Sequence, residues 1–182
     1  MLKDPYLLLQ PRMFYNSAEN EQNICRGLMP LVEKVLNKNS VMVEIGSFAG
    51  VSSEVFAQHV KHISCVDLWT TYHEIGEAEL IAEGERRFDE FASKYKNVKK
   101  IKGDSVSSST LFEDNSLDFV YIDAYNEYSQ VVAEIKAWLP KIKKSGYIGG
   151  HDVCMHQVRN AVVDTLGDVF ESFEDTSWLV KL

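Results

Sequence analysis

The segment from Val43 to Ser52 contains the first residues whose types and spacing suggest chemistry. A β-branched, apolar run leads into two glycines, Gly46 and Gly50, and a helical pattern follows them. A backbone without side chains can approach a ligand closely, and the free N–H groups of a helix N-terminus can bind a carboxylate or a phosphate. The segment predicts either a ligand-binding loop or a strand-to-helix turn that needs glycine for its dihedral angles.

Asp67 supports the ligand-binding interpretation because it lies twenty-one residues after Gly46, at the end of the next predicted strand. An acidic side chain there can accept hydrogen bonds from both hydroxyls of a ribose, although a surface charge or a helix cap is the alternative. A nicotinamide dinucleotide fingerprint would require glycine at Phe48 and Val51, and a Walker loop would require lysine after Gly50. We therefore expect a nucleoside ligand without a pyrophosphate.

Alternating strand and helix patterns must position these residues. Strands are expected at 41–45, 62–68, 98–101, 117–122, 147–150, 169–173 and 178–182, and helices at 24–35, from about 52, at 80–95, 131–142 and 156–166. The last two strands are joined too tightly for a crossover helix, so they are expected to be antiparallel. The pattern predicts an α/β fold with a doubly wound, mostly parallel seven-stranded sheet and an antiparallel last strand, which binds ligands at the strands' carboxyl ends. Residues 1–40 are expected to form a helical extension and candidate lid, and 41–182 the binding domain.

Val43 to Ser52 resembles the first motif of class I S-adenosylmethionine-dependent methyltransferases, and is especially similar to catechol-type and sugar or macrolide O-methyltransferases. The similarity runs from about Val41 to Val163 and implies the Rossmann-like methyltransferase fold with S-adenosylmethionine as cofactor. By this resemblance the cofactor-binding residues are Glu44, Gly46, Ser47 and Gly50 around the methionine part, Ser52 at its carboxylate, Asp67 at the ribose, Gly103, Asp104 and Ser105 at the adenine, and Asp123. Trp69 is a further candidate, for stacking on the adenine.

Two later segments, 121–128 and 146–153, resemble the motifs that follow the family's fourth and fifth strands. In metal-dependent members, the aspartate matching Asp123 and an acidic pair matching His151 and Asp152 hold a divalent ion, usually magnesium. Imidazole is less typical of magnesium and accepts manganese, zinc or iron more readily. We expect these three residues to be catalytic residues and candidate metal ligands; alternatively, the two aspartates cap the following helices.

Methyl transfer from a sulfonium is an in-line displacement, so the enzyme must align the acceptor and make it nucleophilic. An alcohol or phenol must lose its proton, either to a base or through a metal that lowers its pKa. The family often has Lys or His three residues after the strand-end aspartate, whereas this chain has Asn126, which cannot accept a proton. The predicted base is therefore His151, whose ordinary pKa is near ~6.5, unless a metal on Asp123 and Asp152 replaces it.

The overall composition favours a small-molecule partner. The formal net charge of −8 argues against duplex nucleic acid and anionic membranes, which require clustered lysine and arginine. Three widely spaced cysteines suggest no disulfide framework and a cytoplasmic location. No stretch approaches the ~20 apolar residues of a membrane span, and the charged run from 74 to 96 predicts a solvated helix face. Whether the chain forms a homo-oligomer is left open.

The favoured function is methyl transfer from S-adenosylmethionine to an oxygen of a small-molecule acceptor, such as a sugar or a phenolic natural product. Asn126 supports an alternative, a catalytically weak adenosyl-binding domain that acts in sensing or scaffolding. A nicotinamide oxidoreductase is less favoured, because Phe48 and Val51 replace the required glycines.

Overall fold

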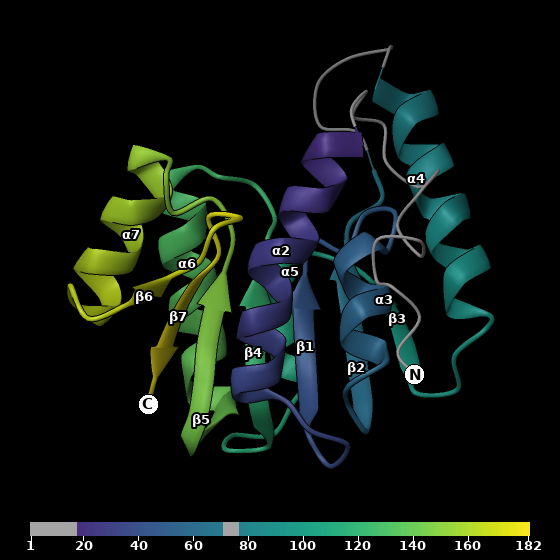
Figure 1. Ribbon diagram of the computed structural model, residues 1–182. Coiled ribbons are helices and arrows are strands. Elements are labelled where there is room, and N and C mark those ends of the chain that lie inside the picture. Colours follow the sequence, from purple (N-terminus) through teal and green to yellow (C-terminus); the bar gives the residue numbers. More distant parts are fainter. Residues whose placement is uncertain (1–17, 71–76) are drawn as a thin grey trace.

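The computed structural model describes residues 18–70 and 77–182, in which strands alternate with helices (Figure 1). The strands are β1 (Val41–Ile45), β2 (His62–Asp67), β3 (Val98–Lys102), β4 (Leu117–Ile122), β5 (Ile142–Gly150), β6 (Glu171–Ser172) and β7 (Trp178–Lys181). The α-helices are α2 (Ala18–Val35), α3 (Val51–Ala57), α4 (Glu77–Ala92), α5 (Ser105–Ser108), α6 (Tyr128–Trp138) and α7 (His156–Leu166), with short 3-10 helices η1 (Ser109–Leu111) and η2 (Leu139–Lys141). None of the helices in this described part is long and apolar enough to cross a membrane.

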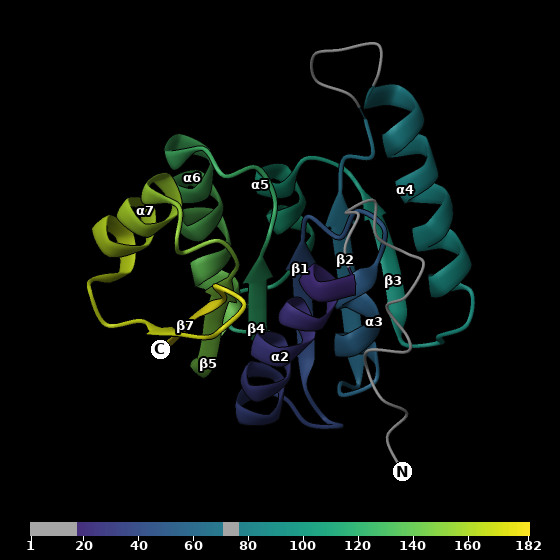
Figure 2. The same cartoon turned by 45° about the horizontal axis from the view of Figure 1, so that its top comes forward.

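The strands form one sheet in the order β3-β2-β1-β4-β5-β7-β6. Neighbouring strands from β3 to β5 pair in parallel, whereas β7 pairs antiparallel with both β5 and β6. The prediction of a mostly parallel seven-stranded sheet with an antiparallel last strand is confirmed. The chain runs outward from β1 to β3 and then returns to β4, so the strand order reverses between β1 and β4. The carboxyl ends of the parallel strands face the top of Figure 1, and Figure 2 brings that edge forward.

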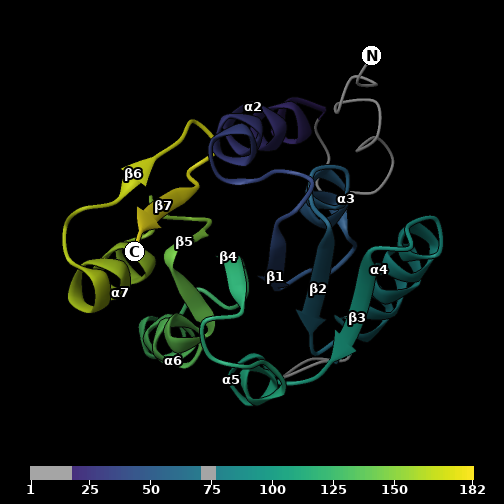
Figure 3. The same ribbon diagram turned by 90° about the horizontal axis from the view of Figure 1, so that it is seen from below.

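Helices cover both faces of the sheet, because its central strands send buried apolar side chains to both sides. On β1, Met42 packs in a cluster with residues of α2, α3 and α4, whereas Val43 and Ile45 pack in a second cluster with residues of α6 and α7. Figure 3 shows α2 and α3 along one face of the sheet, with α5 and α6 along the other. Burial on both faces accounts for the nearly continuous apolar runs of the central strands.

The helix α2 is part of this core in its second half. Leu28, Leu31 and Val32 are buried against the sheet, and the helix continues through Pro30. The predicted lid within residues 1–40 stays a prediction, because residues 1–17 lie outside the described residues.

Two predicted boundaries are corrected in the C-terminal half. The helix α6 ends at Trp138 and β5 begins at Ile142, so Ile142, which was expected to be helical, pairs with Leu117 instead. Pro140 lacks the N–H group that would continue the helical hydrogen bonds, which favours this early end. The strand expected over 169–173 is reduced to Glu171–Ser172, and the side chain of Val169 is exposed.

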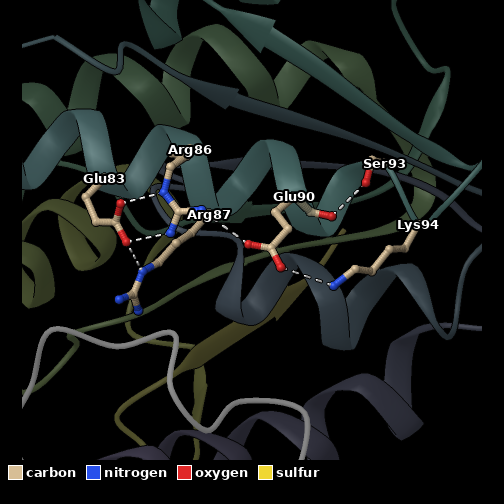
Figure 4. Close-up of polar contacts among 6 residues, drawn as sticks. All are labelled: Glu83, Arg86, Arg87, Glu90, Ser93 and Lys94. Carbon is tan, nitrogen blue, oxygen red and sulfur yellow. Dashed lines mark hydrogen bonds and ion pairs between the residues drawn. The ribbon is translucent and has the colours of Figure 1, made fainter.

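Ion pairs cover the outer surface of α4, as the charged run in the sequence predicts (Figure 4). Glu83 accepts hydrogen bonds from the Nε atoms of Arg86 and Arg87, at 2.6 and 2.8 Å, and these bonds lower the pKa of Glu83 to about 2. Glu90 pairs with Arg86 one turn before it and with Lys94 one turn after it. Exposed pairs of this kind stabilise a helix only slightly, so apolar packing holds α4 on the sheet.

Trp138 offers a test of the packing that supports the carboxyl edge of the sheet. Its side chain is fully buried, and its indole Nε1 donates to the Ser105 carbonyl oxygen at 3.0 Å. Trp138→Phe leaves this carbonyl unpaired and should lower the free energy of unfolding by roughly 1–3 kcal/mol. Urea unfolding measures this loss. Leu111→Ala, at an exposed position, is the control and should change the value by no more than ~0.5 kcal/mol; equal effects of both substitutions would contradict the prediction.

Candidate functional site

The parallel register brings the loops that carry the predicted site residues to one edge of the sheet. Ile45 is aligned with Val66 and Ile122, and Ile122 with Gly150. Pairing continues beyond the strands through four backbone hydrogen bonds: Gly46 N to Val66 O (2.8 Å), Gly103 N to Asp67 O (2.9 Å), Asp123 N to Ile45 O (2.8 Å) and His151 N to Ile122 O (3.0 Å). The four loops therefore leave the sheet side by side.

A cavity of about 490 Å³ lies at this edge, a size typical of small-molecule sites. Six of the predicted cofactor-binding residues line it: Gly46, Asp67, Gly103, Asp104, Ser105 and Asp123. The structure thus brings together residues from the ends of β1, β2, β3 and β4. The other predicted residues, Glu44, Ser47, Gly50, Ser52 and Trp69, are not among the residues that line the cavity.

Glycine is required at Gly46 and Gly50 for different reasons. Both have a left-handed backbone, with φ of 86° and 81°. A Cβ atom on Gly46 would lie 2.0 Å from the carbonyl oxygen of Asp123, so glycine permits the loop after β1 to contact the loop after β4. At Gly50 the added atom would meet the ring of Phe91 at 2.5 Å. Gly46 therefore shapes the cavity, while Gly50 allows α4 to pack over the start of α3.

Asp67 joins the loop after β1 to the end of β2. Its carboxylate accepts hydrogen bonds from the backbone N–H groups of Phe48 (2.9 Å) and Trp69 (2.8 Å). Burial raises the pKa of Asp67, and the hydrogen bonds from these backbone groups oppose the rise. Phe48 has a positive φ of 39°, an uncommon conformation that its hydrogen bond to Asp67 helps to maintain. Asp67 thus presents to the cavity a carboxylate whose orientation is already restrained.

Trp69 lies in the core instead of facing the cavity. Its side chain is 4% exposed and packs against Phe88, with Lys100 Nζ 4.6 Å from the ring centroid. Its indole Nε1 donates to the Phe48 carbonyl oxygen at 2.8 Å, which gives the loop after β1 a second attachment. The observed contacts of Trp69 support this loop and include no approach to the cavity.

Glu44 is a fully buried carboxyl on β1, beneath the start of α3. The hydroxyls of Ser47, Ser52 and Ser53 all donate to it, and the bond from Ser47 measures 2.8 Å. Burial raises the pKa of Glu44 to about 7, although the three serine hydrogen bonds lower it. Glu44 and Ser52 therefore bind one another in this structure, and their predicted contacts with a methionine group stay predictions.

Asp123, His151 and Asp152 form a compact cluster at the ends of β4 and β5. One potential ligand atom from each lies within 4.8 Å of the others, and His151 Nδ1 is 3.2 Å from Asp152 Oδ1 and 3.8 Å from Asp123 Oδ1. His151 Nε2 is buried and has no hydrogen-bond partner among the described residues. Two oxygen donors and one nitrogen donor at these separations fit a divalent cation.

Charge within the cluster changes the acid–base behaviour of its members. Desolvation lowers the pKa of His151, but the hydrogen bond to Asp152 and the charges of Asp123, Asp152 and Asp175 prevail and raise it to about 9. Desolvation also raises the pKa of Asp123 to about 6, against the effect of His151. The raised pKa keeps His151 protonated at neutral pH, as an imidazolium beside both aspartates.

Asn126, which stands where the family often has Lys or His, makes contacts that the sequence did not predict. Its Nδ2 donates to Asp152 Oδ2 at 2.6 Å and contacts the sulfur of Met155. Asp152 itself has a φ of 60°, in the left-handed region that aspartate and asparagine adopt more readily than other side chains. Asn126 and His151 together hold the Asp152 carboxylate in a defined orientation.

Sequence analysis missed Gln130 and Glu134, which line the cavity from α6. Both bond to Ser105, from the predicted adenine loop, and Glu134 is only 1% exposed. Their spacing of four residues places them on one helical face beside buried Val131 and Ile135, and two polar residues within such an apolar stripe were the available signal.

Comparison with protein families matches residues 43–153, more than half of the chain, to a methyltransferase domain. The chain belongs to this methyltransferase family. The matched segment begins in β1 and ends just after Asp152, so it includes every strand end that contributes to the cavity. Comparison with curated protein sequences gives no match.

Solved structures share the fold of this methyltransferase at low sequence identity. SMU.1697c from Streptococcus mutans, in complex with S-adenosylhomocysteine, has a TM-score of 0.61 and 14% identity, with 100% of both chains covered. The N-methyltransferase NodS from Bradyrhizobium japonicum, also in complex with S-adenosylhomocysteine, has a TM-score of 0.59 and 14% identity, covering 98% of this chain and 97% of NodS.

Other matching structures are considerably longer than this chain. It spans 48% of the Bacillus protein YcgJ and 30% of phosphoethanolamine N-methyltransferase 1 from Haemonchus contortus. The Haemonchus structure has a TM-score of 0.57 and 17% identity over 85% of this chain.

The raised pKa of Glu44 predicts a specific dependence of stability on pH. Because the folded state holds this proton more tightly than the unfolded chain, the contribution of Glu44 is fully present below pH ~4.5 and is lost as the pH rises through about 7. The rise in the pKa of Glu44 from 4.5 to about 7 corresponds to a loss of about 3 kcal/mol in the free energy of unfolding. Denaturant unfolding between pH 4.5 and 8 should show this loss in the wild type but not in Glu44→Gln.

The matched control is Glu113→Gln, at an exposed position. It should leave the pH dependence of the unfolding free energy unchanged. Parallel wild-type and Glu44→Gln curves across this pH range would show that Glu44 is ionised in the folded protein.

Proposed function

We propose that this methyltransferase transfers the methyl group of S-adenosylmethionine to an oxygen atom of a small-molecule acceptor. The observation that carries the proposal is the position of Asp123. It lines the cavity with Asp67 and Gly46, and it also belongs to the cluster with His151 and Asp152. Asp123 is therefore shared by the proposed nucleoside site and by the cluster that we propose activates the acceptor.

The cavity fits an adenosyl cofactor in size and in the chemistry of its lining. Asp67 offers carboxylate oxygens to the two hydroxyls of a ribose, and Val66, Leu68 and Ile81 provide apolar surface for a base. Gly46 lets the cofactor approach the backbone on the side of Asp123. The cofactor supplies an electrophilic methyl group, and the chain's task is to direct that group towards the acceptor.

The surroundings of Asp123 favour a phenolic acceptor over a sugar. Tyr125 lines the cavity and is 70% exposed, and Met155, which contacts Asn126, is also exposed. An aromatic ring can stack on tyrosine and contact a thioether, whereas a sugar would need more hydrogen-bonding groups. Asp123, His151 and Asp152 would then lie next to the acceptor hydroxyl.

The cluster would activate that hydroxyl by holding a divalent cation. Such a cation lowers the pKa of a bound alcohol or phenol and so replaces a strong base. Asp123 and Asp152 would supply oxygen ligands and His151 a nitrogen ligand. Asn126 would orient Asp152 through its hydrogen bond to Oδ2. Magnesium is the first candidate for the oxygen ligands, and His151 widens the choice to manganese, zinc or iron. In this arrangement Asn126 has a defined role although it cannot accept a proton.

Asp67→Ala tests the cofactor site. Removing a carboxylate that pairs with buried hydroxyls should weaken S-adenosylhomocysteine binding, measured by calorimetry, by ~1–3 kcal/mol. Because Asp67 also anchors Phe48, the matched control is Trp69→Phe, which removes the other attachment of the loop but keeps the carboxylate. The control should retain most of the affinity. An unchanged affinity in Asp67→Ala would remove Asp67 from the site, and tight binding of NAD without binding of S-adenosylhomocysteine would overturn the proposed function.

Asp152→Asn tests the cation site independently of turnover. Manganese binding, followed by electron paramagnetic resonance, should weaken by roughly 10- to 100-fold when one ligand or its orientation is lost. Asp168→Asn, at an exposed position after α7, is the control and should bind like the wild type. No manganese or magnesium binding by the wild type would exclude the cation, and His151 could then act as the base only after losing the proton that its raised pKa of about 9 retains at neutral pH.

Turnover separates an enzyme from a binding domain. Incubation with S-adenosylmethionine and a set of catechols, simple phenols and sugars should yield S-adenosylhomocysteine with a phenolic acceptor, and a chelator should abolish this product if the cation is needed. Binding of the cofactor without turnover on any acceptor class would favour the sensing or scaffolding alternative.

A further inference from the structure

A buried carboxylate, that of Asp175, lies in the turn between β6 and β7. Asp175 is 6% exposed, and both of its oxygens accept hydrogen bonds from Ser177: Oδ1 from the backbone N–H at 3.0 Å and Oδ2 from the hydroxyl at 2.9 Å. The hydroxyl of Tyr121 on β4 extends this chain, at 2.8 Å from Ser177 Oγ. Neither Asp175 nor its two partners are among the residues that line the cavity. The carboxylate is therefore held in a defined orientation outside the cofactor site.

The helix α2 covers this carboxylate. The turn between β6 and β7 lies against α2 (Figure 3), and Gly27 is the point of contact. A Cβ atom on Gly27 would lie 2.1 Å from Asp175 Oδ1 and 2.3 Å from the Asp175 backbone nitrogen, so only glycine lets the helix approach this closely. Because water is excluded there, the charge of Asp175 acts on its neighbours more strongly than a surface charge would.

The pairing of β5 with β7 brings Asp175 near His151. The two strands are antiparallel, and their pairing continues past the end of β5, where the Val153 N–H donates to the Thr176 carbonyl oxygen at 3.1 Å. His151, which directly follows β5, therefore lies beside Ser177, the residue that anchors Asp175. The two side chains also influence one another: burial lowers the pKa of His151 while the charge of Asp175 helps to raise it, and burial raises the pKa of Asp175 while the charge of His151 lowers it.

The two ring nitrogens of His151 have different surroundings. Nδ1 lies 3.2 Å from Asp152 Oδ1 and 3.8 Å from Asp123 Oδ1, whereas Nε2 is buried without a hydrogen-bond partner among the described residues. A buried N–H group without a partner is costly, so a nearby negative charge stabilises it. Histidines that bind metal ions through one nitrogen usually present the N–H of the other to a carboxylate or a carbonyl, which fixes the orientation of the ring.

We propose that Asp175 is a positioning residue for His151: its carboxylate attracts the Nε2–H group and thereby keeps Nδ1 turned towards Asp123 and Asp152. This inference rests on the proposed function, because Nδ1 is the nitrogen that the proposed cation would use. Asp175 is not one of the candidate ligands itself. Ser177 holds its carboxylate, and α2 shields it from water, so the turn between β6 and β7 supports the cluster from outside the cavity.

Asp175→Asn tests this role because it removes the charge and can keep the hydrogen bonds. The amide oxygen can accept the N–H of Ser177, and the amide NH₂ can donate to Ser177 Oγ. Ser177 Oγ can then donate to Tyr121, since either hydroxyl of that pair can be the donor. The matched control is Glu174→Gln, which removes the same charge from the neighbouring, exposed position in the same turn.

Two measurements follow the effect. In NMR spectra of the histidine ring nitrogens, recorded without added metal, the Nε2–H group of wild-type His151 should exchange slowly with water, and Asp175→Asn should speed this exchange and shift the signal. Manganese binding, followed by electron paramagnetic resonance, should weaken roughly 10- to 100-fold in Asp175→Asn, as expected when the orientation of a ligand is lost. Glu174→Gln should behave like the wild type in both measurements.

The outcomes separate this inference from the proposed function. An Nε2–H signal of His151 that is unchanged in Asp175→Asn overturns the role of Asp175. A wild type that binds no manganese overturns the proposed cation, whereas a ring signal that still changes in Asp175→Asn supports the positioning role. If Asp175→Asn does not fold, Ser177→Ala decides, because it removes the hydroxyl that holds Asp175 Oδ2: a changed Nε2–H signal supports the inference, and an unchanged one overturns it.

Discussion

Backbone hydrogen bonds between the ends of parallel strands determine where every candidate site residue lies. The bonds from Gly46 to Val66, from Asp123 to Ile45 and from His151 to Ile122 extend the sheet by one residue beyond the strands. Each loop therefore leaves the sheet at a defined level along the strands and next to the loop of the neighbouring strand. A shift of register on any one strand would separate Asp67 from Gly46, or Asp123 from His151, so the chemistry depends on pairing that involves no functional side chain.

Two buried glutamates connect this edge to the helices on opposite faces of the sheet. Glu44 receives the hydroxyls of three serines in and before α3, and Glu134 receives Ser105 and Gln130 between α5 and α6. Both carboxyls lie beside elements that form the cavity, and burial raises the pKa of both. They differ in one respect: Glu134 lines the cavity and has one buried oxygen without a hydrogen-bond partner among the described residues, whereas Glu44 does neither.

The fold and six of the residues that line the cavity could be predicted from the sequence because local signals coincide with the positions that tertiary structure requires. Gly46 and Asp123 follow the buried strands β1 and β4, Asp67 ends β2, and Gly103 follows the edge strand β3. Strand ends of this kind can be recognised from strand patterns that stop at small or acidic residues. Glu134 could not be found in this way, since it joins the cavity wall only because α6 packs beside Ser105. Trp69 was misplaced for a related reason: its position after Asp67 is visible in the sequence, but the pocket formed by Phe88 and Lys100 that buries it comes from α4 and β3.

The left-handed backbone at Asp152 limits how this position can diverge. Aspartate, asparagine and glycine tolerate such a φ with little cost, and most other side chains do not. These three residues offer, in turn, a charged oxygen, a neutral oxygen and no donor at all. Because Asp152 does not line the cavity itself, a single substitution at this position changes the donor atoms of the cluster with Asp123 and His151 and leaves every residue that lines the cavity unchanged.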